Sequence, residues 1–252
     1  MAYVNTQKVD DGIFEITFFN EAQNSLPSEI LVQLSEAIRS AGLNPDVKVI
    51  ILKSAGDRTF CAGASFTELL SIIDFETGKK FFSGFAHVIN AIRTCGKIVI
   101  GRVQGKAIGG GVGIAAAVDY CLATTQASIK LSELTIGIGP FVVGPAVERK
   151  LGLSAFSQLT LNASEFYSPQ WGKERGLFVD VFETVEVMDA AILDLAKRLA
   201  SYNAEALSNL KKIFWEGTED WDKLLLERAA ISGKLVLSDF TKNQLTAVDS
   251  KK

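Results

Sequence analysis

Histidine is almost absent from this chain of 252 residues, which contains only His87. A metal site of several histidines is therefore excluded, and so is a Ser-His-Asp triad unless His87 itself serves in it. Cysteine is also scarce, because Cys61, Cys95 and Cys121 are an odd number without short spacing. They predict neither a disulfide framework nor a zinc knuckle, so we expect a reducing, cytoplasmic compartment.

Long apolar runs and an excess of positive charge are missing as well. The longest apolar stretches, such as residues 137–147, are too short and too rich in glycine and proline to span a membrane, and we expect no signal peptide. The net charge of −3 disfavours a general nucleic-acid binder but leaves room for a local basic patch facing a phosphorylated ligand. We therefore expect neither a membrane nor a nucleic acid as partner.

What the chain does contain is typical of an α/β fold in one large domain, with or without a smaller appendage. A hairpin is expected at residues 4–19, buried strands at 47–52, 98–103 and 119–123, and helices at 27–41, 74–95 and 112–118. Gly42 is expected to end the first helix. From about residue 186 the pattern changes to helices alone, at 190–201, 204–215 and 221–237. Their apolar faces suit packing on another subunit or on the chain's own core.

Two short loops of small residues each follow a strand-like run. The first is Phe-Cys-Ala-Gly-Ala at 60–64, and the second is Ala-Ile-Gly-Gly-Gly at 107–111, which opens a helix. Small residues let a ligand approach the backbone closely, and a helix start presents free N–H groups. Two such loops facing one point can hold an oxyanion, which indicates an enzyme acting on a carbonyl compound.

Glu133 is the carboxylate best placed to accompany these loops. It stands in the nearly uncharged segment 131–137, where desolvation raises the pKa of a carboxyl group toward that of a general base. A capping or surface glutamate is the alternative interpretation. The glycines also have alternatives, namely close helix packing or a relaxed dinucleotide fingerprint over 111–116, although residues 104–110 separate that fingerprint from the strand end.

Other polar residues have plainer interpretations. Cys61 is either a nucleophile or a small buried residue, and the second is favoured because no base lies near it in sequence. We expect His87 to be packed within its helix and Asp119 to cap or end one. Four lysines are expected to be solvated unless they meet phosphates: Lys211, Lys212, Lys251 and Lys252.

Several segments, in this order and spacing, together resemble the crotonase (enoyl-CoA hydratase/isomerase) superfamily over almost the whole chain. They are residues 24–26, 60–64, 97–111, 119, 132–133 and 176–179. The resemblance implies a crotonase-like spiral of ββα turns over residues 1–188, forming an acyl-CoA-binding catalytic core. It implies for residues 189–252 an all-helical region that covers the active site and forms a homotrimer or, when two trimers pair, a hexamer.

The resemblance also implies a set of site residues. The substrate would be an acyl-CoA thioester whose carbonyl oxygen lies between the backbone N–H groups of Ala64 and Gly110, with Glu133 as proton shuttle. Coenzyme A would arrive with the substrate, so no separate cofactor and no metal is expected. Three residues match positions along the coenzyme A part, although many members have aspartate at the second: Ala62, Ser65 and Phe66.

The chain departs from the family's hydratases at Gly113. Those hydratases use two glutamates to hold and activate water; the second matches Glu133, but the first matches Gly113. One carboxylate suffices to move a proton from C2 to C4, so the sequence favours double-bond isomerisation. A replacement acid from the variable loop remains open, with three candidates: Glu68, Asp74 and Glu76. Dehalogenation is rejected because the expected aspartate is missing near residues 140–141.

Two alternative functions accompany this prediction. The first is an enoyl-CoA hydratase, including one for a branched or methylated substrate such as methylglutaconyl-CoA. The second, from another class, is a non-catalytic acyl-CoA-binding protein that kept the fold and lost the chemistry. The length and branching of the acyl group stay open, because side-chain identity in residues 66–80 does not fix the shape of a pocket.

Overall fold

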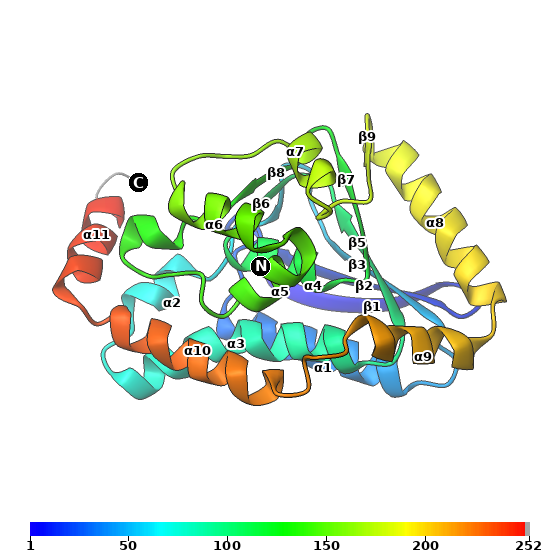
Figure 1. The fold of residues 1–252 in the computed structure, drawn as a ribbon, viewed down its shortest axis with the longest axis horizontal. Helices are drawn as coiled ribbons and strands as arrows, with labels where there is room; N and C mark the ends of the chain where they lie inside the picture. The colour runs from blue at the N-terminus through cyan, green and yellow to red at the C-terminus, as the bar shows by residue number, and fades with distance from the viewer. Residues whose placement is uncertain (250–252) are drawn as a thin grey trace.

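Two sheets of unequal size form the centre of the computed structural model, which describes residues 1–249 (Figure 1). The larger sheet has the strand order β1-β2-β3-β5-β7-β9, with β1 antiparallel to β2 and the other neighbours parallel. The smaller sheet is parallel, in the order β4-β6-β8. The strands are β1 (Ala2–Asp10), β2 (Ile13–Asn20), β3 (Val49–Ser54), β4 (Thr59–Cys61), β5 (Ile98–Val103), β6 (Lys106–Ile108), β7 (Tyr120–Thr124), β8 (Ser128–Lys130) and β9 (Asp180–Phe182).

The chain winds as a spiral because successive strands alternate between the two sheets. β3, β5 and β7 are neighbours in the larger sheet, and each is followed by a short strand of the smaller one, β4, β6 or β8. Helical segments then lead back to the larger sheet. The three short strands are parallel, so their carboxyl ends fall at one edge and the loops after them meet there. This is the spiral of ββα turns that the sequence predicted.

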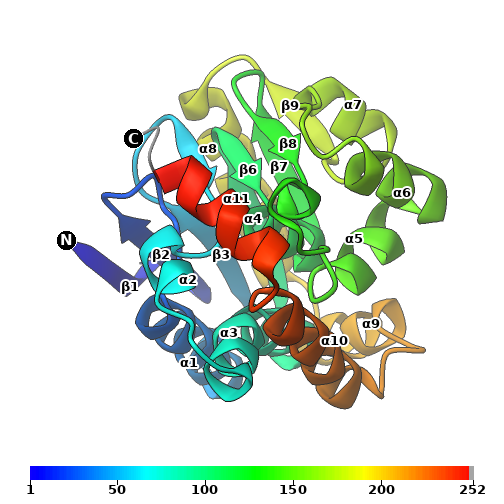
Figure 2. The same ribbon diagram turned by 90° about the vertical axis from the view of Figure 1, so that its left-hand side faces the viewer.

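Helices cover both faces of the larger sheet (Figures 1 and 2). α1 and α3 pack against each other on one face, α10 packs along α3, and α8 lies across the other face. The helices are α1 (Ser28–Leu43), α2 (Phe66–Leu70), α3 (Phe75–Thr94), α4 (Gly110–Ala117), α5 (Gly144–Leu151), α6 (Leu153–Leu161), α7 (Pro169–Glu174), α8 (Val185–Ser201), α9 (Ala204–Phe214), α10 (Trp221–Leu235) and α11 (Asp239–Asp249), with a 3-10 helix η1 (Glu133–Ile136). No helix among residues 1–249 is long and apolar enough to cross a membrane.

The apolar strands are explained by burial on both faces. In β3, Ile50 and Leu52 belong to the main core with α1, α3 and α4, whereas Val49 and Ile51 pack with Met188 of α8. Alternate residues of a strand point to opposite faces, so a strand covered on both sides needs an uninterrupted apolar run. Because of this rule, the bounds predicted from the sequence for β3 and β5 lie within two residues of those in the structure.

The predicted elements differ from the structure at several places, and none was predicted for the segment that forms β8, η1, α5, α6, α7 and β9. The two loops of small residues begin as strands β4 and β6, which are too short to show a periodic pattern. Gly42 does not end α1, since the helix continues to Leu43. A side chain at Gly42 would come within 2.5 Å of the Cys95 carbonyl oxygen, so this glycine serves close packing. The helix α11 was not predicted, because its pattern is mostly polar.

Candidate active site

A cavity of about 330 Å³ opens at the carboxyl edge of the smaller sheet. The loops after β4, β6 and β8 form one side, and the segment before α5 forms another. Two helices from the C-terminal part of the chain, α10 and α11, complete the wall with one residue each, Ser232 and Val248. The wall consists of Ala62, Gly63, Ala64, Phe66, Leu69, Phe82, Ile108, Gly109, Gly110, Ser132, Glu133, Thr135, Ile136, Ile138, Gly139, Pro140, Phe141, Val142, Val143, Ser232 and Val248.

The backbone N–H of Ala64 is aimed by a short extended pairing with Leu26. The Leu26 N–H donates to the Gly63 carbonyl at 2.7 Å, and the Ser65 N–H donates to the Leu26 carbonyl at 3.1 Å. Because successive N–H groups of an extended chain point to opposite sides, the Ala64 N–H faces away from Leu26. It donates to no group within residues 1–249.

The second N–H belongs to Gly110, the first residue of α4. The preceding Gly109 has φ +52° and ψ −114°, a conformation that favours glycine, and its N–H donates to the Lys130 carbonyl at 2.8 Å. The Gly110 N–H has no acceptor within the described chain, as expected for the first turn of a helix. A Cβ built on Gly63 would lie 3.6 Å from this nitrogen, so the two loops are adjacent.

Glu133 stands directly beside these donors. It is the first residue of η1, and a Cβ built on Gly109 would lie 2.9 Å from its Oε1 atom. The residue as a whole is half-buried, but its Oε2 atom is buried and has no hydrogen-bond partner. Desolvation by burial raises the pKa of the Glu133 carboxyl to about 7, against a smaller lowering by its own backbone N–H. A carboxyl group with this pKa can take up and release protons near neutral pH.

The three loop acids that might have replaced a second glutamate are not in the cavity wall. Glu68 accepts hydrogen bonds from the backbone N–H and the hydroxyl of Ser28, both at 2.9 Å, and so caps the start of α1. Asp74 caps α3 through the Thr77 N–H at 2.8 Å, and Glu76 is exposed. Within residues 1–249, Glu133 is therefore the only ionisable group that lines the cavity.

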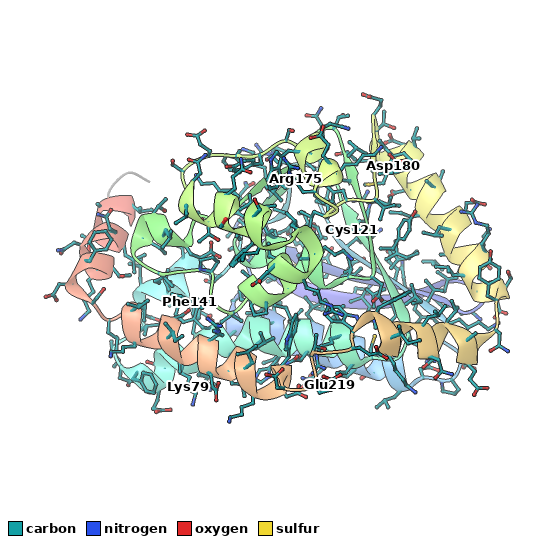
Figure 3. All side chains as sticks on the ribbon, in the orientation of Figure 1. Lys79, Cys121, Phe141, Arg175, Asp180 and Glu219 are labelled. Atoms are coloured by element: carbon teal, nitrogen blue, oxygen red, sulfur yellow. The ribbon has the colours of Figure 1, made fainter. Side chains whose placement is uncertain are left out.

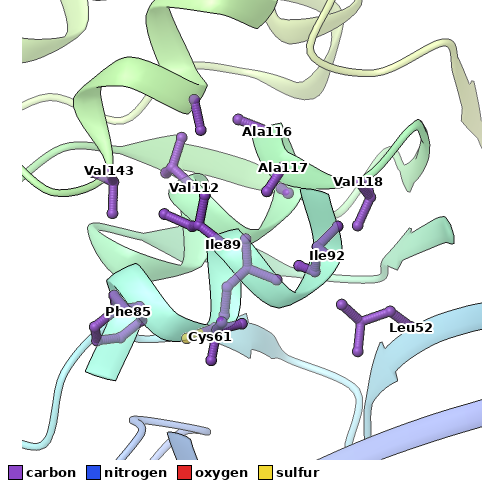
Figure 4. Packing of buried hydrophobic residues seen from close by; sticks show 14 of the residues in the cluster. Leu52, Cys61, Phe85, Ile89, Ile92, Val112, Ala116, Ala117, Val118 and Val143 are labelled. Atoms are coloured by element: carbon purple, nitrogen blue, oxygen red, sulfur yellow. The ribbon is translucent and has the colours of Figure 1, made fainter. Parts of the chain in front are cut away.

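Val143 occupies the space that a side chain at position 113 would need. A Cβ built on Gly113 would lie 2.6 Å from the Val143 Cβ atom and still closer to its Cγ1. Both residues are buried, and Figure 4 shows Val143 within the main core cluster, close to Val112 of α4. A glutamate at position 113 therefore requires Val143 to move.

Comparison with known proteins places this geometry in a family. The model of the enoyl-CoA hydratase/isomerase family matches residues 8–242. The chain belongs to the enoyl-CoA hydratase/isomerase family. This family is part of the crotonase superfamily, and the chain is accordingly an enzyme acting on acyl-CoA thioesters.

Several relatives of this family member carry names for different reactions. A peroxisomal Delta(3,5)-Delta(2,4)-dienoyl-CoA isomerase of Arabidopsis thaliana is 27% identical, with 84% of this chain and 81% of the relative covered. A short-chain-enoyl-CoA hydratase of Clostridium acetobutylicum is 28% identical, with 92% and 88% covered. A mitochondrial methylglutaconyl-CoA hydratase of Mus musculus is 31% identical, with 78% and 63% covered.

Solved structures share the fold over nearly the whole chain. An enoyl-CoA hydratase from Bacillus halodurans superposes with a TM-score of 0.89 at 22% identity, covering 97% of this chain and 99% of that one. An enoyl-CoA hydratase from Mycobacterium avium gives 0.87 at 24% identity, covering 99% and 96%. At these identities the likeness shows the crotonase fold.

The residues expected along coenzyme A lie in different surroundings in this enoyl-CoA hydratase/isomerase family member. Ala62 and Phe66 line the cavity. Ser65 is not part of the wall; it is the N-cap of α2, and its hydroxyl accepts from the Glu68 N–H at 3.4 Å. Cys61 is completely buried, which raises the pKa of its thiol to about 12, so it is a packed residue and no thiolate nucleophile.

The interpretations of three polar side chains differ from the structure of this family member. Asp119 follows the end of α4 but does not cap it: its carboxylate accepts from the Val99 N–H at 2.8 Å, Lys211 Nζ at 2.8 Å and Trp215 Nε1 at 3.1 Å. Lys211 is not solvated, since only 1% of it is exposed. His87 is exposed on α3 instead of packed. Lys212 is exposed as expected, whereas Lys251 and Lys252 lie outside the described residues.

The sequence did not predict the cavity-lining residues that come from segments far from the two loops. Val143 and Phe141 come from the segment between η1 and α5, where Figure 3 labels Phe141. Ser232 and Val248 come from α10 and α11. The only sequence feature that could have pointed to Val143 is Gly113, because a glycine on a buried helix leaves space into which a side chain of another segment can pack.

Proposed function

We propose that this enzyme moves the double bond of an enoyl-CoA thioester, converting a 3-enoyl-CoA into a 2-enoyl-CoA with Glu133 as the only proton carrier. The single observation that carries the proposal is that Glu133 is the only ionisable residue in the cavity wall within residues 1–249. Isomerisation needs one group that takes a proton and returns it, whereas water addition needs a water to be both held and deprotonated.

The first step is removal of the C2 proton by the Glu133 carboxylate. The thioester carbonyl oxygen accepts from the Ala64 and Gly110 N–H groups, which have no other acceptor within residues 1–249. As the C2–H bond breaks, its electron pair forms the C1–C2 double bond of an enolate, and the negative charge develops on that oxygen. One such donor typically contributes roughly 3–4 kcal/mol to the transition state.

The second step returns the proton to C4. The enolate collapses, the C2–C3 double bond forms, and the C3–C4 electron pair takes the proton from the now neutral Glu133 carboxyl group. No atom is gained or lost, and neither water nor a separate cofactor takes part; coenzyme A is a part of the substrate. The apolar contact of Val143 with Gly113 supports this assignment, because it fills space beside α4 that a second acid would need.

Hydration is the second candidate function, and the hydratase relatives favour it. It includes methylglutaconyl-CoA as substrate, since one relative is named for that compound. Water activated by Glu133 alone would produce a 3-hydroxyacyl-CoA. A non-catalytic acyl-CoA-binding protein, the alternative considered from the sequence, does not agree with membership of this enzyme family.

The test is to incubate the enzyme with 3-hexenoyl-CoA and with 2-hexenoyl-CoA separately in deuterated water and to analyse the products by mass spectrometry and NMR. Isomerisation predicts migration of the double bond, deuterium at C2 or C4, and no 3-hydroxyhexanoyl-CoA. Formation of 3-hydroxyhexanoyl-CoA as the main product from the 2-enoyl ester would contradict the proposal and support hydration.

We also propose that the oligomer is a trimer or a pair of trimers, with residues 1–188 as the catalytic core and 189–252 as the helical region that forms it. Three apolar residues on α9 support this, because they are about half exposed: Leu210, Ile213 and Phe214. Light scattering on the purified protein tests the mass. A cytoplasmic location is proposed in addition, supported by three cysteines that are free and buried.

A further inference from the structure

The inner wall of the cavity is a continuation of the protein core. Leu69 of α2 and Ile138, which follows η1, line the cavity and also belong to a buried apolar cluster with Phe81, Val236 and Leu245. The wall around them is completed by aromatic and branched side chains of α3 and of the segment before α5, among them Phe82 and Phe141. An acyl group that passes the oxyanion donors therefore meets hydrocarbon.

The wall contains few polar groups, and its one ionisable side chain within residues 1–249, Glu133, is acidic. Besides the backbone donors and Glu133, the wall has three hydroxyl side chains: Ser132, Thr135 and Ser232. The Thr135 hydroxyl already donates to the Ser132 carbonyl at 2.6 Å. No lysine, arginine or histidine lines the cavity within residues 1–249.

A second carboxylate in this cavity would be desolvated without a cation to balance it. It would also share the space with the Glu133 carboxylate, whose Oε2 atom has no hydrogen-bond partner. Burying an unpaired charge is far more costly than burying a hydrocarbon group of the same shape, and a like charge nearby adds to the cost.

We propose that the acyl group of the substrate is an uncharged hydrocarbon, and that thioesters with a carboxylate at the end of the acyl group are excluded. This inference rests on the proposed function for the orientation of the thioester at Ala64, Gly110 and Glu133. It separates the enzyme from its relative named for methylglutaconyl-CoA, an acyl group that ends in a carboxylate.

The experiment measures binding without chemistry. Isothermal titration calorimetry at pH 8 compares two saturated thioesters of matched shape, pentanedioyl-CoA with its terminal carboxylate and 5-methylhexanoyl-CoA with an isopropyl group in the same place. We expect the hydrocarbon ester to bind at least about 50-fold more tightly, because the coenzyme A part is identical and the two differ in a buried charge. Equal affinities, or tighter binding of pentanedioyl-CoA, would overturn the proposal.

A cation placed in the wall should reverse the preference. Phe141→Arg is expected to tighten pentanedioyl-CoA binding at least about tenfold and to weaken 5-methylhexanoyl-CoA binding. The control Glu76→Arg places the same side chain at an exposed position outside the cavity and should change each affinity by less than about twofold. Thr135→Lys, at an exposed position of the wall, repeats the test if the arginine variant does not fold. An unchanged ratio in a folded cation variant would count against the proposal.

The outcome is independent of the reaction type. Saturated esters cannot isomerise or take up water, so a hydrocarbon preference stands even if product analysis shows hydration. Conversely, isomerisation of 3-hexenoyl-CoA together with equal binding of the two saturated esters would overturn this inference and leave the proposed function intact.

Discussion

Asp119 and Glu133 both carry a carboxylate that the protein buries, and their surroundings are opposite. Asp119 follows α4, its side chain is 4% exposed, and it receives hydrogen bonds from a backbone N–H, a lysine and a tryptophan. Glu133 has a buried oxygen without any partner and faces a cavity. The satisfied carboxylate holds α9 against the start of β5, whereas the unsatisfied one keeps its capacity to exchange protons.

The comparison shows how burial acts on one chemical group in two ways. A buried charge with strong partners becomes part of the framework, since removing any partner leaves the other unpaired. A buried carboxyl without partners has a raised proton affinity and is neutral over part of the physiological pH range.

Replacing Glu133 by glutamine should lower turnover by orders of magnitude while preserving the fold. The amide has the same shape but cannot carry the proton, so kcat for 3-hexenoyl-CoA is expected to fall about 100- to 10,000-fold. Binding of 5-methylhexanoyl-CoA should change little. Glu76→Gln, at an exposed position outside the cavity, is the matched control and should keep kcat within about twofold. A variant Glu133→Gln with normal turnover would remove Glu133 from the mechanism.

Replacing Asp119 by alanine should instead destabilise the protein. Lys211, which is 1% exposed, would lose its charge partner, so the free energy of unfolding should fall by about 3–5 kcal/mol in urea denaturation. The double variant Asp119→Leu with Lys211→Met removes both charges and should regain part of this loss. If the double variant is less stable than Asp119→Ala, the ion pair is not the source of the effect.

The pH dependence should follow Glu133. With a pKa of about 7, the carboxylate needed as base disappears below neutrality, so kcat/KM should fall about tenfold per pH unit below pH 6 and level off above pH 8. The contribution of Glu133 to the stability of the fold depends on pH in the direction opposite to kcat/KM. From the ordinary pKa of 4.5 up to about 7, the folded protein keeps a proton that the unfolded chain has released, so the contribution of Glu133 to stability decreases as pH rises.

Thermal unfolding between pH 5 and pH 8 checks this sign. The melting temperature of Glu133→Gln minus that of the wild type should increase as the pH rises through this range. A constant difference across the range would contradict a raised pKa in the folded state.

Placing an acid at position 113 should destabilise the protein less than Asp119→Ala does. Gly113→Glu forces Val143 aside and should lower the free energy of unfolding by about 1–3 kcal/mol. Adding Val143→Ala opens the space, and we expect this double variant to form 3-hydroxyhexanoyl-CoA from 2-hexenoyl-CoA. The control Gly113→Gln with Val143→Ala has the same bulk without the acid, so hydration by both double variants would show that the carboxylate is not responsible.

The sequence predicted those elements whose physics is local. Buried strands such as β3 and β5 are continuous apolar runs, and α3 has both a regular apolar face and a capping box at Asp74. The resemblance supplied Ala64 and Gly110, whereas Glu133 was also indicated by its nearly uncharged segment; all three residues line one cavity. The roles of Asp119, Lys211 and Val143 were not accessible, because their partners lie on other elements far along the chain.

The sequence by itself determined that this is an α/β chain with two loops of small residues and one carboxylate in an apolar segment, since these depend on residue types and short spacings; the spiral was implied by the family resemblance. The tertiary structure decided which carboxylates are occupied by hydrogen bonds or ion pairs and which one faces the cavity without a partner for one of its oxygens. Glu68 binds Ser28, Asp119 binds Lys211, and Val143 fills the space beside Gly113. Hydrogen bonds and packing act over a few ångströms of space, and only the fold brings those atoms together.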